Sequence, residues 1–336
     1  MDHADWDNVL QYVADPLDLS AAFPDKRNDR SELANLNAQV PTPPLSNDGS
    51  PVQDDPSEPG TLVSVSTTFY PGSNLQPVEP DVVLLSSDSV FFYVHSHLLL
   101  GASDNGFHSL LPPPPASKGE DSILNVPETS TVLNIILHTI YDMSCAHYTP
   151  SFSHLCTAVR RLSFYGIHPE SRILPAAPLY TVLLSQAPLY PLELYTLAAA
   201  FNLYDLAVST SSHLLSFPLS SLTDEMAEAM GPVYLKRLFF LHFGRSDALK
   251  RVLLSPPHPH PPTQWCDFAD QKKLTRAWAL ASAYLAWDAR PDLSTSTMES
   301  ALRPLEEHLG CDDCKQALRD RIKTLVIQWS IVKRTI

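Results

Sequence analysis

The chain has 336 residues, of which 44% are hydrophobic, and this length suits about two globular domains. Its net charge of −14 is concentrated in residues 1–60, which hold twelve acidic and three basic residues, so the remainder lacks the basic face that direct nucleic-acid binding requires. The five cysteines form no disulfide framework, and neither a signal peptide nor a membrane-spanning apolar run is found, which predicts a cytoplasmic or nuclear protein without a membrane partner.

Residues 1–60 are rich in Pro, Asp, Ser and Asn. This composition predicts a disordered acidic arm, because too little apolar surface is available to offset the entropy of ordering. Within the arm, Trp6, Val9, Leu10 and Val13 share one face at helical spacing and are flanked by aspartates. They form a candidate partner motif that folds on binding, including on a transcription-type partner; the alternative is chance periodicity in a frayed tail.

The composition changes at residue 61, where a first strand is expected from the apolar positions Leu62, Val63, Val65 and Phe69. Residues 81–85 and 90–94 are apolar, β-branched and aromatic runs separated by a short polar turn, a pattern typical of a β-hairpin. A helix is expected to follow from His95 to Leu100, with Ser96 as its N-cap.

Four prolines at 112–115 interrupt regular structure, and a third short strand is expected at 122–126. Pro127 is expected to open the next helix, whose apolar face runs from Val132 to Ile140. Further helices are expected at 152–165, ended by Gly166, and at 192–201 and 203–215, with Asn202 between the last two.

Residues 218–336 are expected to be wholly helical. Thr223 should cap the first helix, and Gly231-Pro232 should end it and start the second. A proline-rich loop is expected at 255–262. The remaining helices are expected at 245–254, at 267–288 and around 318–332. One more helix is expected to start at Ser296, which should form a capping box with Glu299.

The segment from Asp81 to Ser103 resembles the opening of a BTB/POZ domain, in which an Asp opens a strand, a hairpin follows and a His starts a helix. The family places an apolar residue four positions after that His and a Ser eight positions after it. The fold signature here is therefore Asp81, His95, Leu99 and Ser103. The later order of a third strand, a helix and a closing helix pair also fits, and the chain past residue 60 is similar to the BTB/POZ proteins of mushroom-forming fungi.

The resemblance implies an α+β fold: a small sheet flanked by helices in residues 61–217, with an insertion at about 145–190, and an all-helical C-terminal domain in residues 218–336. It also implies a non-enzymatic protein–protein interaction module, a scaffold or adaptor that can form a homodimer. The candidate dimer surface consists of Leu62, Val63, Val65, Leu98 and Leu100.

The sequence departs from the family at two further places. Phe107 stands four residues after Ser103, where the family has an aromatic residue after three, and Lys118 stands before Glu120, where cullin-binding members have a hydrophobic residue. Two other functions are kept as alternatives. One is a substrate adaptor of a cullin-type ubiquitin ligase, which the lysine weakens, and the other is a transcriptional regulator acting through the acidic arm.

His95 invites a catalytic interpretation, but a His at a strand-to-helix junction is expected to hydrogen-bond Asp81 or a nearby backbone group and so fix the hairpin. The sequence has no glycine-rich phosphate loop, no G-x-S-x-G elbow and no H-E-x-x-H motif. No catalytic residue is assigned.

A metal site is the one cofactor-related hypothesis. His308, Cys311 and Cys314 form an H-x-x-C-x-x-C motif, and Cys266 is a candidate fourth ligand, with His258 or His260 as rivals for that position. Zinc prefers four N or S ligands in a tetrahedron. The alternatives are that the last two cysteines, one helical turn apart, simply pack, or that they form a redox dithiol, for which a βαβ context is missing.

Overall fold

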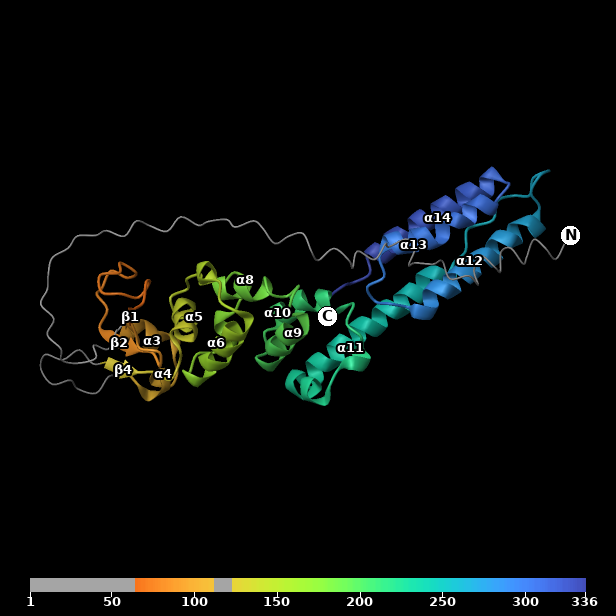
Figure 1. The fold of residues 1–336 in the computed structure, drawn as a ribbon. Coiled ribbons are helices and arrows are strands. Elements are labelled where there is room, and N and C mark those ends of the chain that lie inside the picture. Colours follow the sequence, from red (N-terminus) through yellow and green to blue (C-terminus); the bar gives the residue numbers. More distant parts are fainter. Residues whose placement is uncertain (1–63, 112–122) are drawn as a thin grey trace, which may run out of the picture.

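The computed structural model describes residues 64–111 and 123–336, and Figure 1 shows an elongated molecule with a sheet near one end and a helical bundle at the other. The fold is mixed α+β and mostly helical, with one four-stranded sheet, which confirms the predicted class at this level. Several predictions lie outside the described residues: the acidic arm 1–60 with Trp6, Val9, Leu10 and Val13, the positions Leu62 and Val63, and the Lys118 and Glu120 pair.

The sheet is built around the predicted hairpin, which the structure confirms. β2 (Val82–Leu85) and β3 (Val90–Val94) pair antiparallel, so that Leu84 lies opposite Phe92. Both side chains are at most 2% exposed and face the same core, as expected for a cross-strand pair. The flanking strands are β1 (Ser64–Val65), parallel to β3, and β4 (Ile123–Asn125), parallel to β2, in the order β1-β3-β2-β4.

An N-terminal core of buried apolar side chains joins this sheet to the helices that follow. α5 packs against α6, and α9 against α10. The stretch 145–190, expected as an insertion, supplies Leu155, Val159 and Leu183 to the same core. The elements are α3 (Ser96–Ala102), α4 (Gly106–Ser109), α5 (Ser130–Ile140), η1 (Ala146–Tyr148), α6 (Phe152–Phe164), α7 (Pro169–Arg172), α8 (Pro178–Leu184), α9 (Pro191–Ala200), α10 (Tyr204–Ser211), η2 (Ser212–Leu214) and η3 (Leu219–Ser221).

α11 (Asp224–Leu254) connects the two halves of the molecule (Figure 1). Its cap is Thr223, as predicted, and the predicted break is present because Gly231 adopts φ +69° directly before Pro232. The expected new helix at 245–254 is wrong as a separate element, since the helix continues through this stretch without interruption. The first part of α11 packs in the N-terminal core, up to Leu238, and the part from Leu249 onward packs in a second core.

The second, C-terminal core lies between antiparallel helices. The helix predicted at 267–288 is confirmed, and Asp267 forms a capping box with Asp270 at its start. The predicted box at Ser296 is wrong: Ser294 is the N-cap instead, two residues earlier. The elements are α12 (Phe268–Asp288), α13 (Thr295–Leu302), η4 (Arg303–His308) and α14 (Asp312–Ser330).

Arg321 fastens the loop after α11 to α14. Its guanidinium donates to the backbone carbonyl of Ser255 at 2.7 Å and to that of Val252, and it lies 5.4 Å from the ring centre of the buried Trp278. The positive charge of Arg321 is therefore stabilised by carbonyl dipoles and an aromatic face. This contact fixes the start of the loop that carries the site described below.

Two aspartates of the hairpin cap helices that are distant in sequence. The carboxylate of Asp81 accepts from the backbone N–H of Ser96 at 2.7 Å, at the start of α3, and that of Asp88 accepts from the backbone N–H of Ser130 at 2.7 Å, at the start of α5. Burial raises the pKa of both carboxyl groups, but these hydrogen bonds outweigh it and leave both pKa values below the ordinary range. The caps therefore couple the sheet to the helices that cover it.

We predict that Asp81→Ala and Asp88→Ala each lower the free energy of unfolding by about 1–2 kcal/mol at neutral pH, because each leaves a helix start uncapped. A carboxyl whose folded pKa is lowered contributes stability above its unfolded pKa of about 3.9, and this contribution is lost as the pH falls through the folded pKa. Urea unfolding should show a large difference in the free energy of unfolding between parent and variant near pH 7. The difference should be small near pH 3.

The control is Asp247→Ala, which removes an exposed carboxylate of α11 and is expected to change stability by less than about 0.5 kcal/mol. Equal gaps at both pH values would contradict the capping interpretation.

Candidate functional site

The fold signature is gathered at the junction between β3 and α3. His95 is 1% exposed; its Nδ1 lies 2.7 Å from the hydroxyl of Tyr141 and its Nε2 lies 2.8 Å from the carbonyl of Val78. Since a carbonyl only accepts, Nε2 carries the proton and Nδ1 accepts from the tyrosine. The same hydroxyl accepts from the backbone N–H of His95 at 2.9 Å. Both ring nitrogens and the backbone N–H of His95 therefore have partners. The expected backbone partner is therefore present.

Of the two partners expected for His95, the backbone group is present, and Asp81 is not hydrogen-bonded to its ring. Asp81 bonds instead to the backbone N–H and the hydroxyl of Ser96. The expected N-cap role of Ser96 is wrong for the same reason: it is the first residue of α3, and the cap position belongs to His95, whose own side chain forms no cap. A cap reaching across from the neighbouring strand cannot be read from local spacing.

The other two signature residues, Leu99 and Ser103, also have structural roles. Leu99 is fully buried in the N-terminal core. The hydroxyl of Ser103 donates to the carbonyl of Tyr165 at 2.6 Å and accepts from the backbone N–H of Phe107 at 2.7 Å. The rings of Phe107 and Tyr165 stack with their centroids 4.3 Å apart. The four signature residues thus hold strand, helix and the next turn together.

The residues predicted for a dimer surface are partly described. Val65 of β1 is 44% exposed and Leu100 of α3 is 41% exposed, whereas Leu98 is half-buried against the N-terminal core. Two apolar side chains at the sheet end of the molecule therefore face outward. Isolated exposed apolar residues are common, so their role has to be tested.

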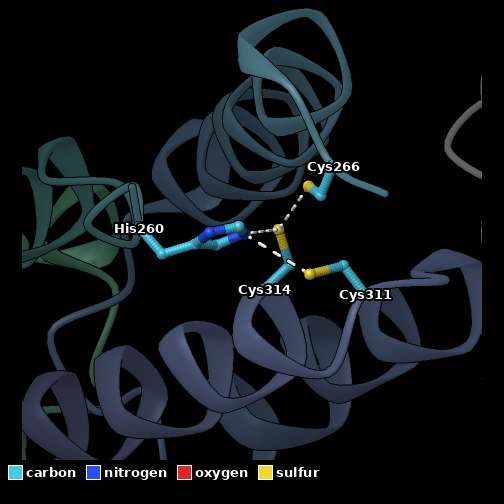
Figure 2. A group of neighbouring side chains, drawn as sticks. All are labelled: His260, Cys266, Cys311 and Cys314. Atoms are coloured by element: carbon cyan, nitrogen blue, oxygen red, sulfur yellow. Dashed lines mark hydrogen bonds between the residues drawn. The ribbon is translucent and has the colours of Figure 1, made fainter. Parts of the chain in front are cut away.

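A second group lies at the far end of the molecule, between the loop after α11 and the start of α14 (Figure 2). His260 and Cys266 come from that loop, Cys311 is the N-cap residue of α14, and Cys314 is in its first turn. One ligand atom from each of the four lies within 4.8 Å of the others. These four side chains, named the His–Cys cluster below, could hold a metal ion such as zinc.

Three of the six separations in the cluster are close to the edges of a zinc tetrahedron. Nε2 of His260 lies 3.4 Å from Sγ of Cys311 and 3.3 Å from Sγ of Cys314, and the sulfurs of Cys266 and Cys314 are 3.7 Å apart. For zinc bound at about 2.3 Å to sulfur and about 2.0 Å to nitrogen, tetrahedral edges are about 3.5 Å between nitrogen and sulfur and about 3.8 Å between sulfurs. These three separations therefore leave room for one ion between the four side chains.

The loop is shaped to present its two ligands. Thr263 and Cys266 exchange backbone hydrogen bonds of 3.0 and 3.4 Å, a tight reversal that turns the cysteine toward α14. Nδ1 of His260 lies 2.8 Å from the carbonyl of Pro261, so this nitrogen carries the proton and the lone pair of Nε2 faces the sulfurs of Cys311 and Cys314. The buried amide of Gln271 donates to the carbonyl of His260 at 3.0 Å and fixes its backbone.

The electrostatics differ among the three thiols. Burial raises the pKa of Cys314 to about 12, with the neighbouring Cys266 thiol adding to it, and burial likewise raises the pKa of Cys266. The pKa of Cys311 is lowered, chiefly because the nearby backbone N–H groups of Cys314 and Asp313 at the helix start favour the thiolate. The carbonyl of Pro261 raises the pKa of His260 by accepting from its ring.

The structure brings the three predicted cysteines together but places a different histidine beside them. Cys266, Cys311 and Cys314 are brought together as expected, but His308, at the exposed end of η4, is not among the four. His260, weighed only as a rival of Cys266, occupies the remaining position. In the sequence it stands six residues before Cys266, in the loop between α11 and α12.

We predict that Tyr141→Phe lowers the free energy of unfolding by about 1–3 kcal/mol, since the backbone N–H and Nδ1 of His95 would both lose their partner in the core. Thermal or urea unfolding measures the change. Tyr284→Phe, on the exposed face of α12, is the matched control and should stay within about 0.5 kcal/mol of the parent. Equal stabilities for the two variants would show that the junction does not depend on this hydroxyl.

Comparisons of the chain with family models, with curated proteins and with solved structures give no match. Across residues 64–111 and 123–336, no helix is both long and apolar enough to cross a lipid bilayer. The function is therefore inferred from the junction around His95, the exposed apolar positions beside it and the His–Cys cluster.

Proposed function

We propose that this chain is a non-enzymatic protein–protein interaction module of the BTB/POZ type, acting as a scaffold or adaptor in the cytoplasm or nucleus. The observation that carries the proposal is the junction at His95, where an antiparallel hairpin passes directly into a helix whose fourth residue, Leu99, is fully buried. Asp81, His95, Leu99 and Ser103 each form a contact that this junction needs, which is a physical reason for the signature to have that spacing.

The order of the later elements supports the same proposal. β4 follows α3 and α4 and pairs in parallel with β2, and α5 comes next and packs near α3. α9 and α10 then form a packed pair around Asn202, whose φ of +52° makes the turn between them. This is the sequence of strand, helix and closing helix pair that the resemblance implies.

The displaced aromatic residue is compatible with this proposal. Phe107 is fully buried although it stands one position later than in the family. The chain accommodates the additional residue in a left-handed segment, with positive φ at Gly106, Phe107, His108 and Ser109. The extra residue is thus absorbed by a tight turn, and the aromatic ring still reaches the core beside Tyr165.

The mode of interaction that we propose is homodimerisation through the sheet end of the molecule. Val65 and Leu100 expose apolar surface there, and an isologous contact would bury the same residues from both subunits. A module of this kind then presents its remaining surface twice to a further protein partner. Neither a membrane nor a nucleic acid is part of the proposal.

We predict that Leu100→Arg converts the dimer to a monomer, because the new charge would be buried against its own copy. Sedimentation velocity at several dilutions measures the state. Leu189→Arg is the matched control: Leu189, between α8 and α9, is 73% exposed and is not part of the proposed surface, so this variant should remain dimeric. A parent chain that is monomeric at all concentrations, or a dimer that survives Leu100→Arg, would contradict the proposed mode.

The same proteins separate the two other functions. Binding of a purified cullin to the parent chain would favour the ubiquitin-ligase adaptor, and loss of partner binding on removal of residues 1–60 would favour a regulator acting through the acidic arm. If the partner binds equally well with and without those residues, and no cullin binds, the scaffold function stands alone.

A further inference from the structure

We propose that the His–Cys cluster binds one Zn²⁺ ion through Nε2 of His260 and the sulfurs of Cys266, Cys311 and Cys314, and that this ion is structural. The ion would tie the loop between α11 and α12 to the first turn of α14. This inference is independent of the proposed interaction function, since the cluster lies in the C-terminal core and the hairpin in the other.

The number and kind of ligands point to a closed zinc site. Four protein ligands complete a tetrahedron and leave no open position for water or substrate, which distinguishes a structural site from a catalytic one. Three thiolates and one imidazole are donors that suit zinc, whereas calcium and magnesium require oxygen ligands. Carboxylates are not among the four residues of the cluster.

The ring nitrogen of His260 that faces away from the sulfurs forms the kind of hydrogen bond that is common in zinc-bound histidines. A zinc-bound histidine generally donates its other ring N–H to a carbonyl or carboxylate, which fixes the ring and its tautomer. In this chain the carbonyl of Pro261 accepts from Nδ1 at 2.8 Å, and the carboxylate of Asp313 lies 4.0 Å from the same nitrogen. The ring is thus oriented before any ion arrives, with Nε2 directed at two sulfurs (Figure 2).

The start of α14 suits the anionic ligands. Cys311 is the N-cap residue of α14, and Cys314 lies in its first turn, so both sulfurs stand at the start of this helix. Three thiolates exceed the charge of a divalent ion by one, and the positive end of the helix dipole favours that excess negative charge. A C-x-x-C pair at a helix start therefore forms one half of the site on a rigid element.

The loop between α11 and α12 buries little apolar surface of its own. Between residues 255 and 267 only Pro257 and Cys266 are buried, and the other side chains are half-buried or exposed, including Trp265 at 85%. A segment with so little apolar burial gains little from the hydrophobic effect, and ordering it costs conformational entropy. Metal coordination would supply the missing attachment, because the binding free energy of a structural zinc is folding free energy.

The experiment measures zinc in the full chain, purified under reducing conditions without chelator. We expect one zinc per chain by elemental analysis, and a cobalt-substituted sample should show the visible absorption bands of a tetrahedral thiolate site. Cys311→Ser and His260→Gln are expected to lower the zinc content to near zero. The matched controls are Cys156→Ser and His308→Gln, which change the same residue types outside the cluster and should keep one zinc per chain.

Failure to fold is separated from loss of the site by hydrogen exchange. In the parent chain, removing zinc with a chelator should increase amide exchange at residues 255–267 and in the first turns of α14, while β2 and β3 stay protected and the oligomeric state is unchanged. Adding zinc should restore protection. A reduced parent chain that binds neither zinc nor cobalt, a disulfide between Cys266 and Cys314 in the freshly purified protein, or equal zinc in His260→Gln and His308→Gln would overturn the proposal.

Discussion

At the end of β3 the chain turns from strand to helix within one residue, and side chains or carbonyls from elsewhere pair the polar atoms that this turn exposes. Tyr141 pairs with the backbone and ring of His95, and Asp81 pairs with the start of α3. Without its tyrosine partner the backbone N–H of the buried His95 would carry a desolvation cost of about 1–3 kcal/mol, and the start of α3 would lose its cap. The sheet, the first helix and α5 are therefore one cooperative unit.

In the C-terminal half, arginine side chains take the place of the aspartates as partners of backbone groups. Arg321 and Arg245 donate to backbone carbonyls at the ends of segments and lie against Trp278 and Trp329. Guanidinium groups suit this role because five donors spread over a flat face can satisfy several carbonyls at once. The His–Cys cluster lies beside this network. Its loop is held at the start by Arg321, and Pro257 and Cys266 are the buried side chains between residues 255 and 267.

Local patterns in the sequence predicted the parts of the fold that local physics controls. The hairpin followed from two β-branched and aromatic runs around a polar turn, and the break in α11 followed from glycine before proline. Contacts between distant segments were not predictable in this way. The cap that Asp81 provides and the choice of His260 over His308 both depend on the path of the chain in space, and one sequence does not specify that path.

The uninterrupted part of α11 has a geometric consequence. From Pro232 to Leu254 it spans about 34 Å as a single rod, anchored at one end in the N-terminal core and at the other in the C-terminal core. Two bodies joined by a stiff spacer keep a constant separation and orientation, unlike bodies joined by a flexible linker. The sheet end and the far bundle are thereby held at a set distance, so surfaces on the two ends keep a fixed position relative to each other.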